Sequence, residues 1–179
     1  MAGDVNTDLQ TDERTAFVQS AVERHRAPLL RYAARLLQGD VDRAQDVVQD
    51  TFVRLLAQEP AEVAGHEAEW LFTVCRHRAF DYLRKEGRVM LFAEGQAERL
   101  TAETPRPGSG VERAEMHAAV LRLLGQLPPN QQEVVRLKFQ NGFSYKEISR
   151  ITSLSVTNVG FILHTAIARL RKEMAALPE

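Results

Sequence analysis

The segment 70–88 concentrates positive charge. Its bases are Arg76, Arg78, Arg84, Lys85 and Arg88, and only Asp81 and Glu86 oppose them. A cluster of guanidinium and ammonium groups can neutralise phosphates, which is the chemistry that a nucleic-acid backbone requires. The preceding segment, 40–69, has the opposite sign, with Arg43 and Arg54 as its only bases. The net charge of −1 therefore hides two charged segments, which indicate two different partners or, more simply, solvated helix faces.

Three aspartates of the acidic segment form what we call the acidic ridge: Asp42, Asp46 and Asp50. They follow one another at four-residue spacing, on one face of a predicted helix that Asp40 can cap. A separate, mostly apolar stripe consists of Ala44, Val47, Val48, Thr51, Phe52 and Leu55. Like charges four residues apart destabilise a helix by roughly a few tenths of a kcal/mol. A purely structural helix does not need the ridge, which favours a basic partner.

The segment 144–171 has the layout of two helices joined by a tight turn. Ser144 and, three residues later, Glu147 predict a capping box at the start of the first helix. A three-residue turn, 153–155, precedes a longer helix, whose predicted packing residues are Val156, Val159, Ile162, Leu163 and Ile167. A helix-turn-helix of this kind places the N-terminal residues of its second helix against base edges in the major groove. The layout favours DNA binding, although similar helical pairs occur in proteins that bind no DNA.

Helical spacing dominates the rest of the chain, and almost no segment alternates like a strand. A helix is predicted over 15–38 with an interruption near Pro28, and a loop over 58–67. The stretch TAETPRPGSG predicts a flexible linker. We therefore predict an all-α chain of two small helical domains joined by a flexible linker. Its predicted parts are a disordered tail over 1–13, a first domain over 14–92 that ends in a short helical cap at 90–92, a linker over 93–110, and a second domain over 111–176.

Composition narrows the classes of function. Hydrophobic residues make up 44% and charged residues 26%, which is typical of a globular chain. The apolar runs are far shorter than the roughly 20 residues that a membrane span needs, and the N-terminus lacks a secretory signal, so we expect a cytoplasmic protein. Cys75 is the single cysteine, which excludes an internal disulfide and a cysteine-based zinc site. The histidines are scattered and no catalytic motif is present, so we expect no enzyme, no metal and no cofactor.

Two long stretches together carry a resemblance to a known family. Region 2 of the extracytoplasmic-function (ECF) RNA polymerase sigma factors resembles two stretches of the first half of the chain, LLRYAARLLQGDVDRAQDVVQDTFVRLL and EWLFTVCRHRAFDYLRK. Their region 4 resembles one stretch of the second half, LPPNQQEVVRLKFQNGFSYKEISRITSLSVTNVGFILHTAIARLR. The resemblance implies a factor that binds the β′ and β subunits of core RNA polymerase and directs initiation of transcription at promoter DNA. It also implies −10 recognition by region 2, −35 recognition by region 4 and control by an anti-sigma factor.

The resemblance also implies roles for individual residues. The residues expected to bind core polymerase are Asp42, Asp46, Gln49, Asp50 and Arg54. Those expected at −10 DNA are Arg76, His77, Arg78, Arg84, Lys85 and Arg88. Those expected at −35 DNA are Lys146, Arg150, Ser155, Thr157, Asn158, Phe161, His164 and Arg171. The loop 59–67 is expected to supply most of the pocket for a flipped base, and Trp70 either stacks on a base or belongs to the core.

The chain departs from the family pattern in three places. Cys75-Arg76-His77 stands where relatives carry a sequence like ARN, and Gln45 stands where they often carry an acid. Relatives usually place a Lys or Arg directly after the valine equivalent to Val159, but here no Lys or Arg occurs between Arg150 and Arg169. Because phosphate contacts supply much of DNA affinity, we expect −35 binding by this helix to be weak or unusually apolar.

Two residues of this second helix, Gly160 and Phe161, are unusual for a helix that binds DNA. Gly160 costs up to about 1 kcal/mol inside a helix, which indicates a close backbone approach to DNA or to another helix. Phe161 either contacts a thymine methyl group or belongs to the core.

The alternative functions are a repressor-like DNA-binding protein and a sigma-like decoy. A repressor would dimerise and bind DNA without polymerase, whereas a sigma factor needs the core enzyme.

Overall fold

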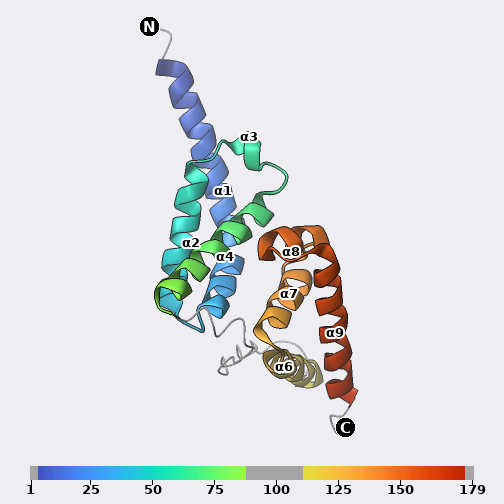
Figure 1. Cartoon of the computed structure of the whole chain (residues 1–179). Helices are drawn as coiled ribbons and strands as arrows, with labels where there is room; N and C mark the ends of the chain where they lie inside the picture. Colours follow the sequence, from blue (N-terminus) through green and yellow to red (C-terminus); the bar gives the residue numbers. More distant parts are fainter. Residues whose placement is uncertain (1–3, 88–110, 176–179) are drawn as a thin grey trace. The chain divides into compact units, whose positions relative to one another are not determined.

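The computed structural model describes the backbone of residues 4–87 and 111–175, and the side chains of 13–87 and 118–175. Every element in these ranges is a helix, which confirms the all-α prediction (Figure 1). The chain divides into two units, residues 1–86 and 87–179. The first unit holds α1 (Asp4–Leu36), α2 (Val41–Leu56), α3 (Pro60–Val63) and α4 (Glu67–Lys85). The second holds α6 (Val111–Gly125), α7 (Pro129–Phe139), α8 (Tyr145–Thr152) and α9 (Val156–Ala175).

The core of the first unit lies where α1, α2 and α4 pack against one another (Figure 1). The stripe of α2 that the sequence predicts is buried in full, from Ala44 to Leu55. From α4 the core receives Leu71 and Phe72, and the Phe72 ring lies 5.0 Å from that of Tyr32 on α1, at a tilt of 42°. Burying each large apolar side chain contributes roughly 1.5–3 kcal/mol, so this interface holds the three helices together.

Helix α1 differs from the sequence prediction. It begins at Asp4, inside the stretch 1–13 for which we expected a disordered tail, and it passes through Pro28 where we expected an interruption. A proline inside a helix removes one backbone hydrogen bond and costs about 3 kcal/mol. The turns that follow it bury Leu29, Ala33 and Leu36 almost completely against the other helices. That apolar burial offsets the cost and keeps the helix continuous.

The connections of the first unit follow local turn chemistry. Gln38 and Gly39 both have positive φ and end the first helical segment, and the Asp40 side chain then accepts a hydrogen bond from the Arg43 N–H at 3.1 Å. Asp40 is therefore the N-cap of α2, as predicted. The predicted loop 58–67 contains the short helix α3, whose Val63 is buried. The predicted helical cap 90–92 and the linker 93–110 lie outside the described residues.

In the second unit, α9 packs on α6, α7 and α8. Its buried side consists of Val159, Ile162, Leu163 and Ala166. Val156, which we expected to pack with them, is 44% exposed, because it begins the helix and lies on its outer side. The packing side was otherwise predicted correctly for Val159, Ile162 and Leu163.

Side-chain caps fix the starts of α8 and α9. The predicted capping box is present: the Ser144 N–H donates to Glu147 Oε2 at 2.7 Å, and the Glu147 N–H donates to Ser144 Oγ at 3.3 Å. The bonds from Ser144 lower the pKa of the Glu147 carboxyl group. Ser153 adopts the left-handed conformation that ends α8, and Ser155 Oγ accepts from the Asn158 N–H at 3.1 Å, which caps α9.

Within the described ranges, no single helix is long and apolar enough to cross a membrane. Helices α8 and α9 pass that test only when taken together, by length and composition, and they are bent by 104° at the turn between them.

The burial of Cys75 generates a prediction about its reactivity. Burial raises the pKa of its thiol to about 12, although a hydrogen bond with Thr51 acts in the opposite direction. The thiolate is the reactive form, so we expect iodoacetamide at about pH 8 to leave the folded chain unmodified. Unfolding in urea should expose the thiol and allow complete alkylation, measured by intact mass. Cys75 is the single cysteine, so the mass change reports this site alone, and rapid alkylation of the native chain would contradict its buried position.

Candidate functional site

The orientation of α2 places the acidic ridge on the surface. Because the opposite stripe is buried, Asp42, Asp46 and Gln49 are all exposed, and Arg54 is exposed one turn further along. Asp50 is only partly exposed, at 35% of its side chain. The predicted polymerase-binding residues therefore share one side of α2, with Asp50 at the edge nearest α4.

Asp50 connects the two charged helices. Its Oδ2 atom lies 3.1 Å from Arg54 Nε, one turn away on α2, and it also forms an ion pair with Arg78 Nε of α4. From the sequence, Asp50 is expected at the polymerase-binding surface and Arg78 at −10 DNA. The structure brings them together, so the acidic ridge and the basic helix share one electrostatic network.

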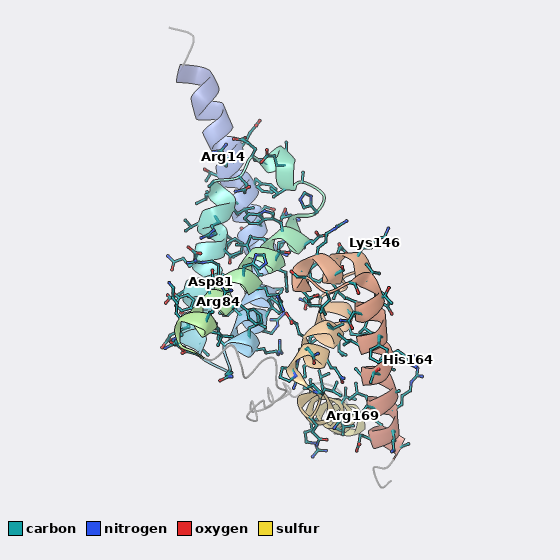
Figure 2. The ribbon with its side chains drawn as sticks, in the orientation of Figure 1. Arg14, Asp81, Arg84, Lys146, His164 and Arg169 are labelled. Atoms are coloured by element: carbon teal, nitrogen blue, oxygen red, sulfur yellow. The ribbon has the colours of Figure 1, made fainter. Side chains whose placement is uncertain are left out.

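The basic residues of α4 lie mostly in the C-terminal half of that helix. Arg78, Asp81, Arg84 and Lys85 line one open depression. Asp81 lies 3.3 Å from Arg84 Nη1 and 3.9 Å from Arg78 Nη1, and Figure 2 shows Asp81 and Arg84 at this end of α4. Arg84 and Lys85 are exposed to solvent. This arrangement can bind phosphate oxygens, with Asp81 keeping the arginines in place until an anion arrives.

The residues earlier in α4 separate into core and surface. Cys75 is fully buried, so its departure from the family pattern concerns packing rather than the outer face. The Arg76 guanidinium lies 4.4 Å from the centre of the Phe80 ring, and His77 is exposed. Arg88, also expected at −10 DNA, lies outside the described residues. Trp70 is half-buried, which settles neither of its two interpretations.

The loop 59–67 is fastened to α1 at both ends, which the sequence analysis missed. Arg14 forms an ion pair with Glu59 at the start of the loop. At its end, Glu67 lies 2.9 Å from His25 Nε2 and 3.1 Å from Arg24 Nη2. Burial lowers the pKa of His25, while Glu67 acts in the opposite direction. These partners are more than 40 residues apart in the chain, so no local pattern could have revealed them.

The outer side of α9 carries the residues predicted to face DNA. Thr157, Asn158 and His164 are exposed, and Phe161 is 68% exposed, so the core interpretation of Phe161 is wrong. Lys146 and Arg150 on α8 and Arg171 on α9 are exposed as well. Figure 2 shows Lys146 on α8 and His164 on α9, both projecting away from the helices that pack behind them.

Two further residues join this surface, and the sequence analysis had named neither. The Tyr145 ring lies against Gly160, where an added Cβ would be 3.7 Å from Tyr145 Cε2. Lys138 of α7 places its ammonium group 5.6 Å from the centre of the same ring. Gly160 therefore does approach another helix, but at an ordinary contact distance. Lys138 of α7 thus places a cation by the ring that lies against Gly160 of α9.

Comparison with known proteins places these features in a class. Residues 21–89 match the family described as Sigma-70 region 2, and residues 117–174 match Sigma-70, region 4. The two helical units are thus the two conserved regions of a sigma-70-type transcription factor, in the expected order. Relatives at 31% and 32% identity, covering 84% and 90% of this chain, are ECF RNA polymerase sigma factors, and the chain belongs to that family. Its function is that of the family, to direct promoter recognition and the initiation of transcription.

Individual relatives agree with this assignment. The chain is 32% identical over 171 residues to the ECF RNA polymerase sigma factor SigL of Mycobacterium tuberculosis, which covers 90% of this chain and 91% of SigL. It is 31% identical over 151 residues to the ECF RNA polymerase sigma factor EcfG of Rhodopseudomonas palustris, covering 84% and 79% of the two chains. The solved structure of the sigma factor RpoE in complex with the anti-sigma factor NepR, from Bartonella quintana, shares the fold. Its TM-score is 0.65 at 23% identity, over 89% of this chain and 98% of that one.

The environment of Gly160 generates a stability prediction. We expect Gly160→Ala to raise the free energy of unfolding by about 0.5–1 kcal/mol, because alanine is the better helix former and its Cβ meets Tyr145 at an ordinary distance. Gly142→Ala is the matched control. It has open space around the added Cβ, but its φ of +77° should make the substitution destabilising by about 1–2 kcal/mol. Urea unfolding followed by circular dichroism measures both. Destabilisation by Gly160→Ala would mean that the fold itself requires the glycine.

Proposed function

We propose that this sigma factor binds core RNA polymerase through the acidic ridge of α2 and contacts −10 DNA through α4 and the loop 59–67. The second unit then contacts −35 DNA through α8 and α9. The observation that carries the proposal is the rotation of α2, whose buried stripe leaves the ridge exposed beside a helix with a basic face. An acidic surface suits a basic partner and a basic surface suits phosphates, so the first unit can bind both at once.

The −10 contact rests on residues of the basic depression and its surroundings. Arg84, Lys85 and His77 are exposed and can take phosphates or hydrogen-bond to DNA, with Arg76 beside the Phe80 ring. The loop 59–67 is fixed by its ion pairs to α1, which suits a preformed pocket for a flipped base. Arg88 lies outside the described residues and stays a predicted −10 contact by its place in the sequence.

The ion pair of Asp50 suggests how the two contacts communicate. Asp50 belongs to the ridge and also holds Arg78. A basic polymerase surface that docks on the ridge would compete with Arg78 for this carboxylate. Arg78 would then be released for DNA phosphates, so polymerase binding would favour −10 binding.

The wider assignment follows the family. The structural neighbour was solved with an anti-sigma factor, and we propose that an anti-sigma factor also controls this chain. We propose that the protein works in the cytoplasm, on core polymerase and promoter DNA, and that it acts by binding rather than by catalysis. The absence of Lys and Arg between Arg150 and Arg169 also suits a decoy that binds polymerase without selecting promoters.

Transcription in vitro tests the function. We expect the chain and sigma-free core polymerase, on a genomic DNA library, to give discrete transcript starts that share a −10-like and a −35-like element. The variant Asp46→Lys should weaken core binding at least about tenfold, because it puts a positive charge on the ridge. Glu23→Lys is the control, since it makes the same change at an exposed position of α1.

The possible results separate the functions. Core binding without transcripts would identify a decoy. Dimeric binding to duplex DNA without polymerase would identify a repressor. If Asp46→Lys and Glu23→Lys weaken core binding equally, the effect is one of net charge and the ridge is not the docking surface.

The pairing of Asp50 with Arg78 gives a second test. In the isolated chain, Asp50→Asn should free Arg78 for a phosphate and steepen the salt dependence of binding to a single-stranded −10 oligonucleotide by about 0.7 in the log–log slope. Asp42→Asn removes the same charge from the same helix but leaves the ion pair in place. Fluorescence anisotropy over a salt series measures both slopes. Equal slopes for the two variants would show that the ion pair does not restrain Arg78.

A further inference from the structure

The exposed side of α9 has an apolar centre. Thr157, Phe161 and His164 follow one another at helical spacing and are all exposed, while Val159 and Ile162 on the other side are buried. With 68% of Phe161 exposed, most of its ring contributes nothing to the core. Ser155 caps the helix, so Phe161 lies in its second turn, in the part of a recognition helix that reaches base edges.

Gly160, directly before this ring, is not explained by packing inside the chain. An added Cβ there would meet only the Tyr145 ring, at 3.7 and 3.9 Å, which is ordinary contact. Alanine would fit, and it would favour the helix by up to about 1 kcal/mol. The missing Cβ leaves room beside the Tyr145 ring, which is itself 42% exposed, so a partner outside the chain can come close there.

The charges around this surface narrow what can approach it. No Lys or Arg occurs on α9 before Arg169, so the first turns of the helix offer no cation to a phosphate. The exposed neighbours of Phe161 on α9 are the polar Thr157 and Asn158 and, one turn later, His164. Such a surface suits base edges rather than backbone. The apolar group on the major-groove edge of a base pair is the 5-methyl group of thymine.

We infer that Phe161 packs on the 5-methyl group of a thymine in the −35 element, and that Gly160 allows the helix to approach closely enough for this contact. The helix thus selects thymine by apolar contact where related helices use cations. This inference rests on the proposed function, because it needs the second unit to meet −35 DNA. A protein partner is the weaker alternative, since a stable interface buries roughly 800 Å² on each side and one phenyl ring supplies a small part of that.

The test removes one methyl group at a time from the DNA. Holoenzyme is assembled from core polymerase and the full chain, and its promoter is taken from the transcript mapping. Each thymine of the −35 element is then replaced by deoxyuridine, which lacks only the 5-methyl group. We expect wild-type holoenzyme to bind about fourfold more weakly at the contacted position, the factor that burying one methyl group provides. Phe161→Ala should bind more weakly to the thymine promoter and be indifferent to the replacement.

Phe139→Ala is the matched control. Phe139 is 62% exposed at the end of α7, so the variant loses a similar exposed ring away from α9 and should keep the wild-type response to deoxyuridine. Gly160→Ala should weaken promoter binding although it stabilises the fold.

Three results would overturn the inference while leaving the function intact. They are a wild-type holoenzyme that transcribes but ignores deoxyuridine, a Phe161→Ala variant that keeps the fourfold response, and a Phe161→Ala variant that loses only polymerase or inhibitor binding. A chain that directs no transcription would instead refute the proposed function, and the inference with it.

Discussion

The burial of one side of α2 is the constraint on which the first unit depends. Ala44, Val47 and Leu55 are completely buried between α1 and α4, which fixes how far α2 is rotated about its axis. The stripe and the ridge lie on different sides of α2, so burying the stripe leaves Asp42 and Asp46 exposed. The acidic ridge is thus exposed because of the apolar packing behind it. A different rotation would bury carboxylates without partners, at a cost far above what the core could offset.

Ion pairs then adjust this arrangement rather than create it. Pairs on a protein surface contribute roughly 0–1 kcal/mol, so neither Arg78 with Asp50 nor Arg24 with Glu67 stabilises the fold by much. These ion pairs instead help to position α4 against α2 and the end of the loop 59–67 against α1. Because such pairs are weak, a partner with a complementary charge can replace them. The same charged groups can therefore position the free protein and bind its targets.

The second unit divides its surface differently. Local caps at Ser144 and Ser155 begin α8 and α9, and one side of α9 forms much of the core. The cations that can reach phosphates lie on the flanks, at Lys146 and Arg171, while the centre of the recognition helix is uncharged. We expect such a surface to favour contacts with base edges over salt-dependent contacts with phosphates. The Tyr145 ring of α8 lies against Gly160 near that centre, and the Lys138 ammonium of α7 lies by the same ring.

The sequence alone determined the caps of α2 and α8 and most of the buried stripes of α2 and α9, because these depend on periodicity and on residues within a few positions of one another. It also determined the family, since regions 2 and 4 occur in order within one short chain. It failed at Pro28, where burial of more distant residues keeps the helix continuous. Only the tertiary structure decided that Phe161 is exposed and that Asp50 and Arg78 meet. Those outcomes depend on how helices rotate and pack against one another, which a one-dimensional pattern does not contain.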